Sequence, residues 1–208
     1  MISQGNKLLF KIARQRVVVS RIFAILVLLL ALFTAGSFRE DSLTDTLLEM
    51  SGLFLLTICS MGRLWALLYI SGHKKIELIT EGPYSMVRHP LYVFSLIGAI
   101  GIGLASENIL VLAALIIFYL LYYPLTILVE EAKLTDKFGQ AYLDYIKSTP
   151  RFLPKLSLYK SPPQVVVNTD IFLKSIAIGM WFIWIYIALN FIEAIQLFGN
   201  IPVFLRVP

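Results

Sequence analysis

Long apolar segments, separated by short polar ones, dominate this chain. A helix needs about 20 apolar residues to cross the hydrocarbon core of a bilayer. Five segments approach that length, covering residues 18–36, 48–70, 91–106, 109–128 and 172–196. None alternates apolar and polar residues as the strands of a transmembrane β-barrel do. The pattern predicts an all-α polytopic membrane protein with about five transmembrane helices.

The third and fourth apolar segments are separated only by Ser106–Asn108. Such a short connection predicts a tight antiparallel helical hairpin. After the fourth segment, Leu134, Phe138 and Tyr142 recur at four-residue spacing among charged residues. This spacing predicts an amphipathic helix at the cytoplasmic membrane surface, with Gly139 as a point where it can break.

Composition and charge support a membrane protein rather than a soluble one. Hydrophobic residues make up 58% of the 208 residues and charged ones 15%, which is more apolar surface than a soluble domain of this size buries. The net charge is +5, but most basic residues precede the first segment or follow the second and fourth. This bias fits the positive-inside rule. It predicts a cytoplasmic N-terminus and an external C-terminus, and it does not favour nucleic acid as a partner.

The chain has few residues with which to bind a metal. Cys59 is the only cysteine, and the two histidines are far apart in the sequence. Zinc sites need several such ligands at characteristic spacings, so we predict no metal site. Because no internal repeat or low-complexity segment is present, we treat residues 1–208 as a single membrane domain.

Polar residues gather where the third apolar segment begins and the fourth ends. They are Tyr84, Arg88, His89, Tyr92, Glu130 and Glu131. The predicted hairpin brings these two places to the same membrane surface, so we expect His89 and Glu130 to be neighbours in space. A simpler interpretation is also open, because arginine, histidine and tyrosine are common at membrane interfaces.

Arg63 lies within the second apolar segment. An unpaired arginine at the centre of a membrane helix costs at least about 2.5–3.5 kcal/mol. The second segment runs inward, so its side chains lean away from the nearer, cytoplasmic surface. We therefore expect Arg63 to have a partner. A functional role and a structural pair inside the bundle remain equally open.

Three motifs occur in a specific order: "EGPYSMVRHPLY", then "EEAKLTDKFGQAYLDY", then "RFLP". This order resembles the integral-membrane methyltransferases of the isoprenylcysteine carboxyl methyltransferase and phospholipid methyltransferase family. The resemblance covers about residues 76–154, and residues 171–197 form an extra C-terminal span beyond it. It implies that S-adenosylmethionine is held on the cytoplasmic side by this core. A lipophilic acceptor, either a lipid or a prenyl-type molecule, would enter from the bilayer.

The resemblance also implies roles for individual residues. The implied cofactor contacts are Leu78, Ile79, Tyr84, His89, Pro90, Leu91, Tyr92 and Glu130. In this interpretation Glu130 pairs with the cofactor's ammonium group, Arg88 or His89 with its carboxylate, and a tyrosine face with its sulfonium. The candidate catalytic residues are Arg88, Glu131 and Arg151. Glu131 and Arg151 would orient the acceptor or take a proton from an amine.

The sequence departs from this family in two places. In the carboxyl methyltransferases an arginine stands about one turn before the glutamate pair, where this chain has Leu125–Ile127. That difference argues against a prenylcysteine acceptor. Phe94 stands where a small residue is frequent, and it would narrow the pocket. Two other functions are kept open: an NADPH-dependent membrane reductase resembling the sterol reductases, and a non-enzymatic transporter or scaffold.

Overall fold

The computed structural model describes residues 15–36, 43–71, 77–197, 199 and 204–207. The longer helices are α2 (Arg16–Phe33), α3 (Leu43–Ile70), α5 (Pro90–Ala105), α6 (Ile109–Phe138), α8 (Thr169–Gly179) and α9 (Trp181–Leu197). The shorter elements are α4 (Pro83–Met86), α7 (Gln140–Ser148), the 3-10 helix η1 (Leu156–Leu158) and the strands β1 (Thr34–Gly36) and β2 (Leu205–Val207). The predicted all-α class is confirmed. The basic N-terminal tail, residues 1–14, and residue 76 of the predicted core lie outside the described residues.

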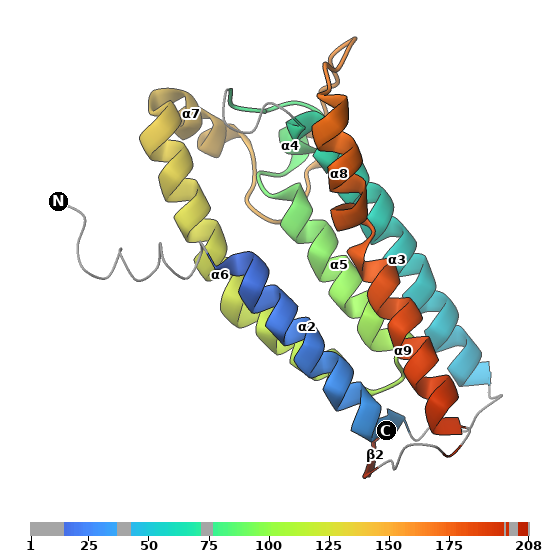
Figure 1. Ribbon diagram of the computed structural model, residues 1–208. Coiled ribbons are helices and arrows are strands. Elements are labelled where there is room, and N and C mark those ends of the chain that lie inside the picture. Colours follow the sequence, from blue (N-terminus) through green and yellow to red (C-terminus); the bar gives the residue numbers. More distant parts are fainter. Residues whose placement is uncertain (1–14, 37–42, 72–76, 198, 200–203, 208) are drawn as a thin grey trace, which may run out of the picture.

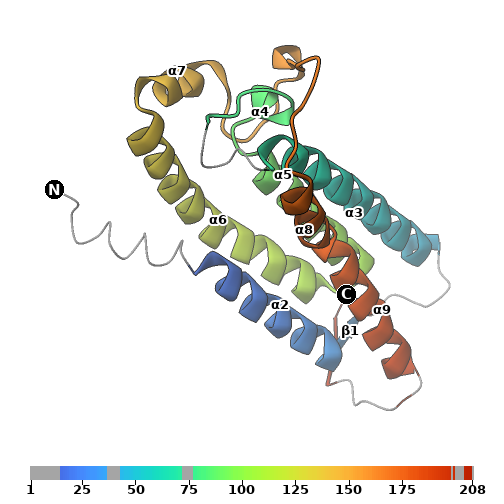
Figure 2. The ribbon, with the colours of Figure 1, turned by 45° about the horizontal axis from the view of Figure 1, so that its top comes forward.

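The helices form one elongated bundle, in which α3, α5, α8 and α9 lie on one side and α2 and α6 on the other (Figure 1). A buried apolar cluster joins α2, α3, α5, α6 and α9, and its members are Val27, Ala31, Leu56, Ile102, Val111 and Leu189. We call the end where α5 begins the site end and the end where α5 meets α6 the far end. From the far end, α5 and α6 diverge toward the site end, where α4 and α7 lie (Figure 2).

Apolar helices long enough to cross a membrane confirm an integral membrane protein. Three stretches are sufficiently long and apolar: Leu43–Ile70, Ile109–Phe138 and Thr169–Gln196. The helices over Val18–Phe33 and Pro90–Ala105 are apolar but shorter. Large hydrophobic side chains cover the outer surfaces of these helices. Lipid is the solvent that such a surface requires.

The hairpin predicted between the third and fourth segments is present as α5 and α6. Glu107 takes a positive φ of 50° in the connection, and Asn108 caps α6. The Asn108 side-chain oxygen accepts hydrogen bonds from the backbone N–H groups of Leu110 and Val111 at 3.0 and 3.4 Å. A single capping residue therefore begins a helix of 30 residues.

The first and last predicted spans need correction. The first was predicted to continue to residue 36, but α2 ends at Phe33 and residues 34–36 form a parallel pairing with residues 205–207. Thr34 adopts an extended conformation, and its hydroxyl donates to the Leu30 carbonyl at 2.7 Å. The last span was predicted as one helix over 172–196, but it begins at Thr169 and is interrupted at Met180.

The fourth span also differs, because α6 continues well past residue 128. Glu130 and Glu131 lie inside the helix rather than beyond its end. The helix stops at Gly139, which has a φ of 54° that favours glycine. The amphipathic segment is thus divided between the last turns of α6 and the separate helix α7, which buries Tyr142 and Tyr145.

Candidate active site

The segment before α5 takes its shape from its prolines. Pro83 begins the single turn of α4, and Pro90 stands at the first position of α5, where its fixed φ is favourable. His89 occupies the N-cap position, and its carbonyl accepts the backbone N–H groups of Tyr92 and Val93. Arg88 and His89 therefore stand at the mouth of the hairpin and reach α6.

Glu131 is the centre of the polar contacts at the site end. Its Oε1 accepts hydrogen bonds from Arg88 Nη1 at 2.9 Å, from His89 Nε2 at 3.1 Å and from Arg151 Nε at 3.1 Å. Arg151 Nη2 pairs with the other carboxylate oxygen. We call these four residues the Glu131 cluster. Glu131 and His89 are buried, and charge-assisted hydrogen bonds satisfy the buried carboxylate.

Glu130 belongs to a separate, aromatic group. The Tyr92 hydroxyl donates to Glu130 Oε2 at 2.6 Å. The Tyr92 ring lies edge-on to Tyr123, with centroids 5.3 Å apart, and 5.7 Å from the His89 ring. The Tyr119 hydroxyl donates to the Tyr92 carbonyl at 2.9 Å. Tyr119 and Tyr123 of α6 therefore contact the first turn of α5. The Glu130 carboxylate lies beside this group of aromatic rings, bound to Tyr92.

Tyr84 and Tyr145 extend this aromatic group toward α7. The Tyr145 hydroxyl donates to the Tyr84 carbonyl at 2.7 Å. Burial raises the pKa of Tyr145. Burial, followed by the negative charge of Glu130, raises the pKa of Tyr84. Both phenols are therefore neutral hydrogen-bond donors at neutral pH.

The segment after α7 is tied to the segment before α5 by backbone hydrogen bonds. The Arg88 N–H donates to the Pro150 carbonyl at 2.9 Å, and the Lys155 N–H donates to the Met86 carbonyl at 3.0 Å. These two bonds bracket Arg151 and direct it toward Glu131. The "RFLP" motif thus contributes to the Glu131 cluster although it lies far from "RHP" in the sequence.

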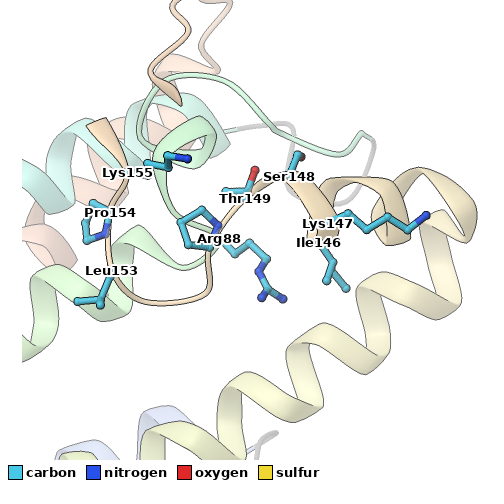
Figure 3. Close-up of a pocket in the computed structure, with 9 residues that line it drawn as sticks. Arg88, Ile146, Lys147, Ser148, Thr149, Leu153, Pro154 and Lys155 are labelled. Carbon is cyan, nitrogen blue, oxygen red and sulfur yellow. The ribbon is translucent and has the colours of Figure 1, made fainter. Parts of the chain in front are cut away.

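An open pocket of about 510 Å³ adjoins the cluster (Figure 3). Its lining residues are Arg88, Ile146, Lys147, Ser148, Thr149, Pro150, Leu153, Pro154 and Lys155. The lining contains cations and hydroxyl groups but no acidic side chain. The Lys147 side chain points away from Lys155 in Figure 3 and pairs with Asp144 at 2.9 Å. Arg88 belongs both to this pocket and to the Glu131 cluster.

Most of the residues singled out from the sequence meet at this end of the bundle. Arg88, His89, Glu131 and Arg151 form one cluster, and Tyr92 and Glu130 lie beside it. The start of α5 and the last third of α6 are thus spatial neighbours, as the hairpin predicts.

Four other predicted residues make no side-chain contact of this kind among the described residues. Leu78 and Ile79 are half-buried in the segment before α4. Pro90 is buried at the first position of α5. Leu91 contributes its carbonyl, which accepts hydrogen bonds from Arg63 and Ser95.

The sequence analysis did not single out Tyr119, Tyr123 and Tyr145. Tyr119, Tyr123 and Glu130 are four and seven residues apart and share one face of α6, so helical spacing from Glu130 was a signal that could have found two of them. Phe94 was expected to narrow the pocket, but its ring packs on α3 instead. A Cβ added at Gly62 would lie 2.1 Å from the Phe94 ring, so Phe94 fills the α3–α5 interface.

Comparisons with known proteins place this site in a family. The family model described as phospholipid methyltransferase matches residues 19–141. The chain is also similar to the protein-S-isoprenylcysteine O-methyltransferase of Tribolium castaneum. The two are 32% identical over 83 residues, which are 40% of this chain and 30% of that protein. The fold and these matches define a membrane methyltransferase. The chain belongs to the phospholipid methyltransferase family, and the resemblance found in its sequence is confirmed.

Two relatives match nearly the whole chain. The nickel-cobalt-cadmium resistance protein NccN of Alcaligenes xylosoxydans xylosoxydans is 36% identical over 197 residues, which are 95% of this chain and 92% of that protein. The cobalt-zinc-cadmium resistance protein CzcN of Cupriavidus metallidurans is 36% identical over 190 residues, 91% of this chain and 85% of that protein. No solved structure matches the chain. Within the described residues, no group of three or more His, Cys, Asp or Glu residues is arranged to hold a metal ion.

Proposed function

We propose that this protein transfers a methyl group from S-adenosylmethionine to a lipophilic acceptor at the site end of the bundle. The observation that carries the proposal is the meeting of two remote segments. The start of α5 and the last third of α6 bring a carboxylate, cations and aromatic faces together beside a pocket. These groups lie at the ends of apolar helices, within reach of a molecule dissolved in lipid.

The residues present fit the cofactor's charges. S-Adenosylmethionine, when bound, supplies an activated methyl group on a sulfonium, and it also has an ammonium group, a carboxylate and an adenine ring. In this proposal Glu130 pairs with the ammonium group, and the faces of Tyr84 and Tyr92 attract the sulfonium. Arg88, at the edge of the pocket, receives the carboxylate. The half-buried Leu78 and Ile79 would contact the adenosyl part.

Glu131 has a different role in this proposal from Glu130. Its carboxylate already accepts hydrogen bonds from Arg88, His89 and Arg151, which leaves it poorly suited to take a proton. We therefore assign Glu131 to positioning: it holds the two arginines and the histidine in place. Arg151 would orient the acceptor, because its side chain is 43% exposed, whereas Arg88 receives the cofactor's carboxylate.

The basic pocket supports an acceptor with an anionic group. Lys155 lines it, together with the hydroxyl-bearing side chains of Ser148 and Thr149. The family's name already includes phospholipid as an acceptor, and a headgroup phosphate suits this lining. Leu125–Ile127 offers no cation to a prenylcysteine carboxylate. A phospholipid-type acceptor is therefore the acceptor we propose.

Cofactor binding is the direct test. Isothermal titration of the detergent-solubilised protein with S-adenosylmethionine should give a Kd that rises at least about tenfold in Glu130→Gln, because a charge-assisted bond contributes at least about 1.5 kcal/mol. His89→Ala should bind more weakly too. Asp136→Asn is the matched control, since Asp136 is exposed on the same helix. Absence of binding by the parent protein, or stabilisation by NADPH in its place, would overturn the proposal.

The acceptor is identified in cells. Membrane lipids from a host that expresses the parent protein should contain a species heavier by one methylene group. The same host with Glu130→Gln should lack that species. An unchanged lipid profile, together with cofactor binding in vitro, would point to an acceptor other than a lipid.

We further propose that this methyl transfer contributes to tolerance of divalent transition metals. The observation that favours this role is the match, over more than nine-tenths of the chain, to two proteins named for metal resistance. Growth of a sensitive host on cobalt or cadmium should improve with the parent protein and not with Glu130→Gln. Equal tolerance with both would separate metal resistance from methyl transfer.

A further inference from the structure

Arg63 joins three helices inside the apolar part of the bundle. It lies on α3, and its Nη1 donates to Ser95 Oγ at 2.6 Å and to the Leu91 carbonyl at 3.4 Å, both on α5. Its guanidinium carbon lies 5.4 Å from the ring centroid of Phe182, on α9. The sequence predicted that Arg63 has a partner. In the structure its partners include the Ser95 hydroxyl, the Leu91 carbonyl and the Phe182 ring.

The α5 groups that Arg63 contacts belong to the turn that presents the candidate site. Ser95 Oγ also donates to the Leu91 carbonyl at 2.8 Å, so Arg63 and Ser95 hold the same oxygen. Tyr92 follows Leu91 directly, and its hydroxyl is bound to Glu130. A shift of the Leu91 carbonyl would therefore move Tyr92. The charge of Arg63 also acts on the Tyr84 phenol, as does that of Glu130.

Phe182 comes close to Arg63 because α5 has a glycine at the crossing. A Cβ added at Gly98 would lie 2.5 Å from Cys59 Sγ and 2.7 Å from Phe182 Cδ1. Real Cβ atoms do not approach other atoms so closely. The backbone of α5 thus touches both α3 and α9 here, and the Phe182 ring fills the space over the guanidinium. Small residues allow such close approach of helices in lipid.

Helix α9 lies beyond the part of the chain that defines the family. The family model ends at residue 141, whereas α9 begins at Trp181. The hydrogen bonds of the Glu131 cluster run among residues that all precede the C-terminal span. Phe182 nevertheless connects it to the first turns of α5 through Arg63. This connection gives the extra span a physical link to the site.

We propose that Arg63, held in place by the Phe182 ring of the C-terminal span, is a positioning residue that sets the first turn of α5 and with it Tyr92. The effect of Arg63 on cofactor binding rests on the proposed function. Its effect on the position of Tyr92 does not. A planar guanidinium can stack on a ring and donate to two oxygens at once, which a lysine ammonium does not do in the same way. Arginine in particular is therefore required.

The first experiment changes the ring and keeps the charge. Phe182→Leu should raise the Kd for S-adenosylmethionine by about tenfold, because the desolvated cation–π contact is lost. Phe182→Tyr should restore binding to within about twofold of the parent, since it keeps the ring. Trp184→Leu is the control, because Trp184 lies on the same helix but is 59% exposed. Equal losses in Phe182→Leu and Trp184→Leu would overturn the inference.

The second experiment tests whether the two residues act as a unit. Arg63→Lys should weaken cofactor binding about as much as Phe182→Leu. The double variant should be no worse than either single one, because residues in one contact are not additive. Additive losses would mean that the two residues act independently, and would also overturn the inference. Unfolding temperatures of all variants, measured in the same detergent, separate positioning from general loss of the fold.

A third measurement does not depend on the cofactor. This measurement uses a variant with Tyr92→Cys and Glu130→Cys. The rate at which a short bismaleimide cross-links the two cysteines reports how often position 92 on α5 and position 130 on α6 come close together. Phe182→Leu should slow this cross-linking, whereas Trp184→Leu should not. If the parent binds no S-adenosylmethionine but cross-linking still depends on Phe182, the proposed function fails and the positioning role holds. Cross-linking that is indifferent to Phe182 overturns the positioning role, whatever the parent binds.

Discussion

The two ends of the helical bundle stabilise their polar groups in opposite ways. At the far end, the Asn108 amide donates to the Thr34 hydroxyl at 2.7 Å, and the Gln196 amide donates to the carbonyls of Ala31 and Leu32. These groups are neutral. At the site end, the buried carboxylate of Glu131 is surrounded by Arg88, His89 and Arg151.

Two glutamates make the contrast sharper. Glu107, at the far end, lies close to Asp45, and burial raises its pKa from 4.5 to about 8, with Asp45 adding to the increase. The neutral form of Glu107 is therefore favoured more than that of an ordinary glutamate. Glu131 instead pairs with the guanidinium groups of Arg88 and Arg151, which stabilise its negative charge. Buried charges are expensive to maintain. The comparison therefore shows that the far end stabilises neutral groups, whereas the site end retains ionised ones.

The largest expected effect comes from neutralising the centre of the site end. Glu131→Gln keeps the side-chain size but leaves Arg88 and His89 without their counter-charge. We expect a loss of about 3 kcal/mol in the free energy of unfolding, the low end for a broken buried pair, because Arg151 is partly exposed. Methyl transfer should fall with it. Chemical denaturation in detergent measures the stability.

The matched control for that change is Asp144→Asn, which breaks the exposed pair with Lys147. No measurable loss of stability is expected, because exposed ion pairs contribute little. Similar losses in both variants would contradict the special position of Glu131.

A smaller effect is expected from the far end. Asn108→Ala removes the cap of α6 and leaves the Thr34 hydroxyl without its donor. The free energy of unfolding should fall by about 2 kcal/mol, while the Kd for S-adenosylmethionine stays the same. Asn190→Ala is the control, since the Asn190 amide donates to a carbonyl of its own helix. A changed Kd in Asn108→Ala would show that the two ends are coupled.

The pH dependence of stability tests Glu107. Its pKa is raised in the folded state, so its contribution to stability is complete below pH 4.5 and is lost as the pH rises through about 8. The unfolding temperature should therefore decline over this range, and Glu107→Gln should flatten the decline. Glu81→Gln, an exposed glutamate, should leave it unchanged. A profile that Glu107→Gln does not alter would argue against a raised pKa of Glu107.

The smallest expected effect concerns Tyr142 in α7. Its hydroxyl is buried and makes no well-formed hydrogen bond among the described residues, although the Arg88 guanidinium is near. Burial raises its pKa to about 12. Tyr142→Phe should leave the free energy of unfolding unchanged or raise it by up to about 1 kcal/mol, because a buried hydroxyl without a partner is costly. Tyr145→Phe, which loses the bond to the Tyr84 carbonyl, should instead lower it by about 1 kcal/mol. Equal losses would mean that the Tyr142 hydroxyl has a partner after all.

Much of the fold could be predicted from local patterns. The apolar segments located the helices, and the short connection at Ser106–Asn108 predicted the hairpin. Gly139 was predicted as a break in the amphipathic segment, and α6 ends there. Residues 34–36 were assigned to a helix because they continue an apolar segment. They form a strand because they pair with residues 205–207. These partners come from the other end of the chain. No local pattern contains that information.

The sequence predicted the charged residues that meet in the candidate site, but neither all of its tyrosines nor the pairing of its side chains. The hairpin was enough to place His89 near the glutamates of α6. Adjacent helical residues, however, point about 100° apart, so the rotation of α6 about its axis decides which glutamate receives the cations. That rotation depends on packing, including Tyr119 and Tyr123 against Tyr92. Phe94 was misjudged for the same reason, because Gly62 on another helix makes room for it.

The sequence by itself determined that this chain is a helical membrane protein with three methyltransferase-like motifs, because hydrophobic length, turn residues and motif order can all be read along the chain. Only the tertiary structure decided that Glu131 collects the cations, that Glu130 faces the tyrosines, and that Arg63 meets Phe182 from the C-terminal span. These pairings arise between helices that are distant in the sequence. Their geometry depends on how closely the glycine-bearing faces of the helices approach.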